Sequence, residues 1–147
     1  MTCQVIDATS PRPQSGAMTE TTTAPNPPRS FDGVVESYFA AWNETNTERR
    51  RALVEAAFAP DGVYCDPLSL AEGPEAIDTM VAGIQAHYPD HALNLTSPVE
   101  EHHDVLRFEW TIFEPGGAVM IEGLDVVELA TDGRFQRVNG FFSSRPA

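Results

Sequence analysis

The chain has 147 residues, a length typical of one domain, and its formal net charge is −13. So acidic a protein repels phosphate groups, which disfavours nucleic acids and anionic membrane surfaces as partners. All nine basic residues are arginine, and without lysine a mechanism through a lysine Schiff base is excluded.

Residues 1–30 contain five prolines and a run of three threonines, with almost no apolar residues in periodic positions. Such a segment buries too little apolar surface to offset its ordering entropy, so we expect a disordered tail before one folded domain at residues 31–147. It lacks the basic start and apolar core of a signal peptide, and no later segment has the roughly 20 apolar residues that cross a bilayer. Cys3 and Cys65 offer no disulfide within the domain, which favours a reducing, cytoplasmic location.

Three segments have the apolar spacing of helices. The first covers residues 31–43, with Ser30 as a plausible N-cap. The second begins near Thr45, where a capping-box spacing occurs, and runs to about residue 58. The third begins with Pro74 at its first position and ends before a second proline. These patterns predict three helices in the first two thirds of the chain.

The remaining segments alternate like strands. A short strand is expected at residues 63–66, and four more follow near 91–101, 104–114, 118–130 and 134–143. The predicted order is therefore α-α-β-α-β-β-β-β. Helices gathered early and strands gathered late indicate an α+β fold, with the helices on one face of a curved, mostly antiparallel sheet.

Asp125 lies on the apolar side of its predicted strand. The alternate residues on that side are Val119, Ile121, Gly123, Asp125, Val127 and Leu129. A carboxylate facing the interior is costly when unpaired and tends to take up a proton. A neutral Asp in a dry pocket can donate a hydrogen bond to developing negative charge. The alternative is a structural Asp paired with a backbone group or with Arg107.

Asp66 and Tyr38 are the other candidate catalytic residues. Asp66 points to the same side of its strand as Tyr64, and at a pocket mouth it could accept a proton from a carbon next to a carbonyl. The Asp-Pro pair is also an ordinary turn, so a structural role stays open. Tyr38 lies on the apolar face of the first helix, where its hydroxyl needs a partner, and it is either a core residue or a catalytic one.

Large apolar residues on inward positions are candidates for the wall of a ligand pocket. They are Trp42, Tyr64, Met80, Phe108, Trp110, Val138 and Phe142, with plain core packing as the alternative for each. The histidines share no helical face, and a proline separates His87 from His91, so no metal site is expected. His103 is a weaker candidate for a pocket-edge acid or base. No cofactor is expected either, since there is no glycine-rich phosphate loop.

The local sequences at residues 38–43, 58–67, 123–125 and 132–134 resemble the SnoaL-like group of the nuclear transport factor 2-like superfamily. The resemblance implies a cone-shaped fold with a pocket between the sheet and the first helix. Among such proteins, ketosteroid isomerases have similar surroundings of Tyr38, Asp66 and Asp125. By that match, Tyr38 and Asp125 would donate to an oxyanion and Asp66 would be the general base. The segment between Tyr38 and Asp66 is longer here, so steroid specificity does not follow.

Two functions compete at this stage. One is a cofactor-free isomerase, cyclase or lyase that uses Asp acid–base chemistry on a small apolar carbonyl compound. The other is a non-catalytic ligand-binding or dimerisation module of the same fold. Both predict a homodimer, and outward-facing Met120, Leu124 and Val126 support the second surface that the module needs. The enzyme requires the three candidate residues around one open cavity, whereas a collapsed cavity or an Asp125–Arg pair favours the module.

Overall fold

Three helices form from the segments that have apolar residues at helical spacing: α1 (Asp32–Asn43), α2 (Thr47–Ala57) and α3 (Pro74–His87). The computed structural model describes residues 31–144, so the predicted disordered tail and the Ser30 cap lie outside the described residues. The side chain of Asn46, rather than that of Thr45, caps α2 by accepting a hydrogen bond from the Arg49 backbone N–H at 2.9 Å. Pro74 begins α3 as predicted.

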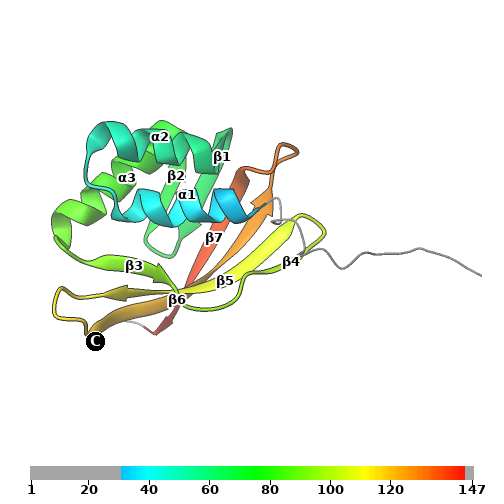
Figure 1. Ribbon diagram of the computed structural model, residues 1–147. Helices are drawn as coiled ribbons and strands as arrows, with labels where there is room; N and C mark the ends of the chain where they lie inside the picture. The colour runs from blue at the N-terminus through cyan, green and yellow to red at the C-terminus, as the bar shows by residue number, and fades with distance from the viewer. Residues whose placement is uncertain (1–30, 145–147) are drawn as a thin grey trace, which may run out of the picture.

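Seven strands form one curved sheet whose inner face carries all three helices (Figure 1). They are β1 (Phe58–Asp66), β2 (Ser69–Glu72), β3 (Ala92–Leu95), β4 (Glu100–His102), β5 (Val105–Phe113), β6 (Val119–Leu129) and β7 (Phe135–Ser144). The strand order is β2-β1-β7-β6-β5-β3, with β4 pairing to β5. β1 and β7 are parallel and the other pairs are antiparallel, so the predicted α+β fold and mostly antiparallel sheet are confirmed.

The strand boundaries differ from the prediction in three places. β1 begins at Phe58 rather than at residue 63, and an irregular register before Val63 accommodates the Pro-Asp-Gly stretch at residues 60–62. β2 was not predicted; it pairs antiparallel with the end of β1 after a tight turn. The strand expected at 91–101 divides into β3 and β4, because Pro98 between them has no N–H for a sheet hydrogen bond.

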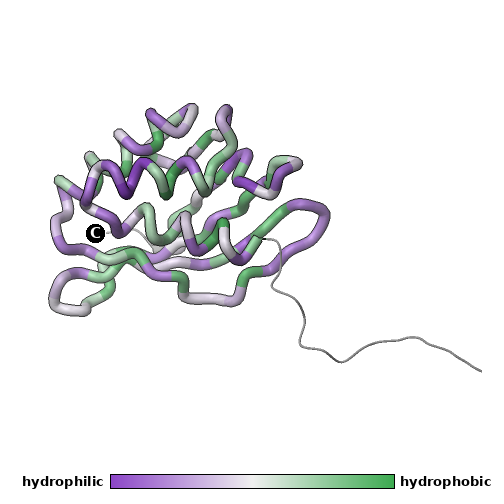
Figure 2. Tube along the Cα trace, turned by 45° about the horizontal axis from the view of Figure 1, so that its top comes forward, coloured by the Kyte–Doolittle hydropathy of each residue, from purple (hydrophilic) through white to green (hydrophobic). Residues whose placement is uncertain are grey.

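The core lies between the helices and the inner face of the sheet. Its largest fully buried side chains include Phe58, Phe108, Phe135, Ile77 and Leu106. Hydrophobic and hydrophilic residues alternate along the helices and strands (Figure 2), as two-sided elements with one buried face require. No helix among residues 31–144 is long and apolar enough to cross a membrane.

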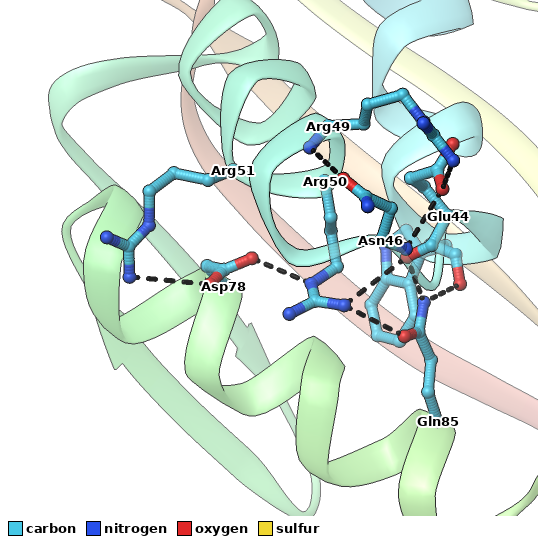
Figure 3. A network of polar contacts seen from close by, with 8 residues as sticks. Glu44, Asn46, Arg49, Arg50, Arg51, Asp78 and Gln85 are labelled. Carbon is cyan, nitrogen blue, oxygen red and sulfur yellow. Dashed lines mark hydrogen bonds and ion pairs between the residues drawn. The ribbon is translucent and has the colours of Figure 1, made fainter.

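A buried ion pair connects α2 to α3 (Figure 3). Arg50 Nε donates to Asp78 Oδ1 at 2.7 Å, and both side chains are about 5% exposed or less. Arg50 also donates to Gln85 Oε1, and Gln85 Nε2 donates to the carbonyl oxygens of Trp42 and Glu44 at the end of α1. The network therefore ties all three helices together, and it fixes the backbone of Trp42, a residue of the cavity described below.

Replacing Arg50 with Ala is expected to lower the free energy of unfolding by about 3 kcal/mol, because Asp78 would lose its buried partner. Arg51 offers a matched control. It also pairs with Asp78, at 3.6 Å, but its side chain is 51% exposed, so Arg51→Ala should cost less than about 1 kcal/mol. Urea unfolding of both variants measures the difference. Equal losses would contradict the assignment of the buried pair as the main tie between α2 and α3.

Candidate active site

A cavity of about 380 Å³ opens between α1, α3 and the inner face of the sheet. Its lining comes from both helices and from six strands or their turns. The residues are Tyr38, Trp42, Tyr64, Asp66, Leu68, Ser69, Ile84, Tyr88, Leu93, Trp110, Ile112, Met120, Ile121, Asp125 and Phe142. The wall is thus mainly apolar and aromatic, with two carboxylates, a composition typical of small-molecule sites.

Asp125 lies on β6 at the base of this cavity and is 1% exposed. The Tyr38 hydroxyl donates a hydrogen bond to its Oδ2 at 2.7 Å, and Trp110 Nε1 donates to its Oδ1 at 2.9 Å. Arg107, the alternative partner considered from the sequence, instead pairs with Glu100 and Glu109. Asp125 is therefore buried and hydrogen-bonded, with two neutral donors and no arginine.

Burial raises the pKa of Asp125 to about 7. The hydrogen bonds from Tyr38 and Trp110 lower it, since they stabilise the carboxylate, and the charge of Asp66 raises it again. Burial, together with the charge of Asp125, also holds the pKa of Tyr38 well above its ordinary value, so its hydroxyl keeps its proton. Asp125 can consequently gain or lose a proton near neutral pH, as an efficient general acid or a hydrogen-bond donor requires.

Asp66 ends β1 at the cavity wall and is half-buried. Its Oδ2 accepts a hydrogen bond from the Tyr64 hydroxyl at 2.7 Å, and its Oδ1 accepts one from the Leu68 backbone N–H at 2.8 Å. Burial raises the pKa of Tyr64 well above its ordinary value, so this donor also stays protonated. The two bonds fix the direction in which the Asp66 carboxylate faces the cavity.

Gly140 on β7 separates the two carboxylates. It pairs with Asp125 across the β6–β7 ladder. A Cβ added at this glycine would lie 3.1 Å from Asp125 Oδ1 and 3.2 Å from the Cβ of Asp66. A side chain here would therefore crowd both acids, whereas glycine leaves them facing one shared space.

The structure brings the three candidate catalytic residues, Tyr38, Asp66 and Asp125, around one open cavity. Of the seven expected wall residues, four line this cavity: Trp42, Tyr64, Trp110 and Phe142. The other three are corrected by the structure. Phe108 and Val138 are completely buried in the core, and Met80 packs against that core. Alternation shows which face of a strand is inward, but not where along that face the packing opens into a cavity.

Several wall residues were not singled out from the sequence. Leu68 and Ser69 reach the cavity from the unpredicted turn and strand after β1, and Tyr88 reaches it from the end of α3. Met120 was expected to face outward, but it lines the cavity and packs against the cluster of Leu93, Trp110 and Ile121. A register shift between Ile112 and Phe113 places an extra residue on β6, which reverses the alternation there.

No histidine of the described residues lines this cavity, although His87 and His91 pack against the ring of Tyr88, which does. His102 ends β4, and His103, with a φ of 48°, begins the tight turn to β5. Within residues 31–144, no group of three His, Cys, Asp or Glu side chains is placed to hold a metal ion. Cys65 points away from its neighbours Tyr64 and Asp66 and does not contribute to the cavity wall.

A family model of the SnoaL-like domain matches residues 35–138. The chain belongs to the SnoaL-like family. A solved structure from Agrobacterium tumefaciens strain C58, a proposed isomerase of this family, is 36% identical to the chain. The match covers 78% of this chain and 98% of that chain, with a TM-score of 0.74.

More distant structures share the SnoaL-like fold. A proposed polyketide cyclase from Sinorhizobium meliloti is 18% identical, covers 76% of this chain and 98% of its own, and has a TM-score of 0.60. A cystatin-like protein of unknown function from Methylobium petroleophilum PM1 is also 18% identical, with 80% and 78% covered and a TM-score of 0.64. No curated protein matches the chain. At this identity the likeness concerns the fold, so function must be argued from the cavity.

Proposed function

We propose that this SnoaL-like protein is a cofactor-free isomerase, cyclase or lyase that moves a proton on a small, uncharged, apolar carbonyl compound. The observation that carries the proposal is the pair of carboxylates on one apolar cavity, with the pKa of the buried Asp125 raised to about 7. The 36% identical protein from Agrobacterium tumefaciens, which is described as a proposed isomerase, supports this proposal. The two acids differ in burial and in partners, and such a difference allows opposite roles in one reaction.

Asp66 is the proposed general base. Its carboxylate removes a proton from the carbon next to the carbonyl, and the electron pair of that C–H bond moves onto the carbonyl oxygen. Neutral Asp125 donates a hydrogen bond to this oxygen as it becomes negative, and the Tyr38 hydroxyl turns its single proton from Asp125 to the same oxygen. Protonated Asp66 then returns the proton to a different atom, which gives an isomer without a net change in charge. The donor form of Asp125 is lost as the pH rises through about 7.

The charge of the wall restricts the substrate. Asp66 and Asp125 are the acidic side chains of the cavity, and no arginine or histidine of the described residues lines it. An anionic substrate would bring a like charge next to the Asp66 carboxylate without a compensating cation. The aromatic side chains, Trp42 and Trp110 among them, instead suit the face of an apolar ring.

The test is exchange of hydrogen for deuterium in D2O, followed by proton NMR, on a panel of cyclic ketones. We expect the protein to catalyse exchange at the carbon next to the carbonyl, because proton removal is the shared first step of these reactions. A ketone and its carboxylate-bearing analogue form a matched pair, and the anion should react at least about tenfold more slowly. Binding of the neutral ketones without any exchange would contradict catalysis and favour the binding module.

One observation keeps that second candidate function, a dimerisation module, in view. Phe141 and Leu70 are 52% and 64% exposed on the outer face of the sheet, opposite the cavity. Leu124 pairs with Phe141 on the same face, so apolar side chains adjoin there. This face is the proposed contact of a homodimer, which is compatible with either function.

A further inference from the structure

Trp110 and Gly123 lie directly opposite each other on β5 and β6. A Cβ added at Gly123 would collide with the indole of Trp110, at only 2.6 Å from its Cη2. The indole therefore lies across the bare backbone of the glycine. From this position its Nε1 reaches Asp125, two residues further along β6, at 2.9 Å.

We infer that Trp110 is a positioning residue for Asp125 and that Gly123 is needed because it leaves room for the indole. This explains the Gly-x-Asp sequence of β6. Gly123, its first residue, leaves space for the indole of Trp110, and Asp125, its third residue, accepts the hydrogen bond from the indole N–H. The inference deepens the proposed function, since it concerns the acid on which that function rests.

The indole N–H differs from the other donor to Asp125 in one respect. It can only donate, whereas the Tyr38 hydroxyl can both donate and accept. Oδ1 accepts from Trp110, and the carbonyl oxygen of a neutral carboxyl accepts better than its O–H oxygen. The indole therefore favours the neutral form of Asp125 with its proton on Oδ2, the oxygen next to Tyr38. Trp110 thus favours one of the two oxygens of Asp125 as the proton donor.

The titratable groups around Asp125 come from three other elements. Tyr38 faces it from α1, Tyr64 and Asp66 from β1, and Tyr88 lines the same cavity at the end of α3. Trp110 has no ionisation of its own. Its removal should therefore change the titration of Asp125 without adding another titrating group.

The experiment follows the side-chain carboxyl carbon of Asp125 by 13C NMR as the pH is varied, with Asp125→Asn identifying the signal. The wild-type midpoint is expected near 7. Trp110→Phe keeps a ring over Gly123 but loses the donor, so the midpoint should rise by about one pH unit. Trp42→Phe is the matched control, because it removes the other indole of the cavity, which makes no hydrogen bond to Asp125 and acts on it only through the Tyr38 hydroxyl. It should shift the midpoint much less than Trp110→Phe does.

The indoles give a second readout. The chain has two tryptophans, so its 15N spectrum has two indole N–H signals, which the two Phe variants assign. The Trp110 signal should titrate with the same midpoint as Asp125, and it should stop titrating in Asp125→Asn. Gly123→Ala provides a further variant, in which the intact indole is displaced and the midpoint should rise as in Trp110→Phe.

Two results would overturn the inference. One is an Asp125 midpoint that is the same in Trp110→Phe and Trp42→Phe, and the other is a Trp110 indole signal whose chemical shift does not change as Asp125 ionises. Circular dichroism confirms that each variant is folded, which matters for Gly123→Ala because its Cβ would also crowd the Phe141 carbonyl. The titrations need no substrate. Positioning by Trp110 can therefore fail while ketone exchange is observed, or hold while exchange is absent, so the two proposals are tested separately.

Discussion

Replacing Asp66 with Asn is expected to reduce deuterium exchange on a reactive ketone by about 10²–10⁴-fold, the usual contribution of a general base. The amide has nearly the same shape as the carboxylate but cannot take up the proton. Its oxygen can still accept from the Leu68 backbone N–H, and its NH2 group can donate to the Tyr64 hydroxyl. The melting temperature should therefore stay almost unchanged, and exchange rates together with thermal unfolding measure both effects.

Asp61 gives a control for this experiment. It lies on the same strand, β1, but it is exposed and bonds to Gln136, outside the cavity. Asp61→Asn makes the same chemical change and should leave the exchange rate as in the wild type. Retained exchange in Asp66→Asn would remove Asp66 from the mechanism, and Asp125 would then be the carboxylate left to act as base.

A second large effect is expected on stability. The pKa of Asp125 is about 7 in the folded chain and near 3.8 in the unfolded chain. Between these values the folded chain keeps a proton that the unfolded chain releases. The free energy of unfolding therefore falls as the pH rises from about 4 to 7, by roughly 4 kcal/mol in total, and this contribution is constant above 7.

Asp125→Asn isolates this contribution from that of the other carboxylates. The asparagine oxygen can accept from Trp110, and its NH2 group can donate to the Tyr38 oxygen, so the site keeps two hydrogen bonds. Urea unfolding at pH 5 and pH 8 gives the difference between variant and wild type at each pH. The variant should gain stability relative to the wild type at pH 8. A difference that does not depend on pH would show that Asp125 titrates alike in both states.

The fold was largely predictable because its signals are local. Helical spacing identified α1 and α3, and the alternation around Asp125 placed its carboxylate inside. The resemblance to the SnoaL-like group then joined Tyr38 and Asp66 to Asp125, although they lie 87 and 59 positions before it in the chain. The roles of these three residues stay proposals until turnover is measured.

What the sequence did not reveal depends on contacts between distant segments. Met120 faces the cavity because the register between β5 and β6 shifts next to it. The residue pattern of β6 alone cannot reveal this shift, since it depends on how β6 pairs with β5. Trp110 was expected as an apolar wall, whereas its N–H bonds to Asp125 because it lies opposite a glycine. Arg50 stands in a run of three arginines that has the appearance of a solvated surface, yet its partner Asp78 comes from another helix.

Because β7 lies between β1 and β6 in the sheet, the sheet can be completed only after β7 has been synthesised. β1, with Asp66, and β6, with Asp125, are both made earlier, but each pairs with β7 rather than with the other. Until residues up to about Ser144 have left the ribosome, the nascent chain has two separate sheet fragments, and its two acids cannot share one space. The cavity therefore forms only when β7, the last strand of the sheet, enters between β1 and β6 and brings Asp66 and Asp125 to one space.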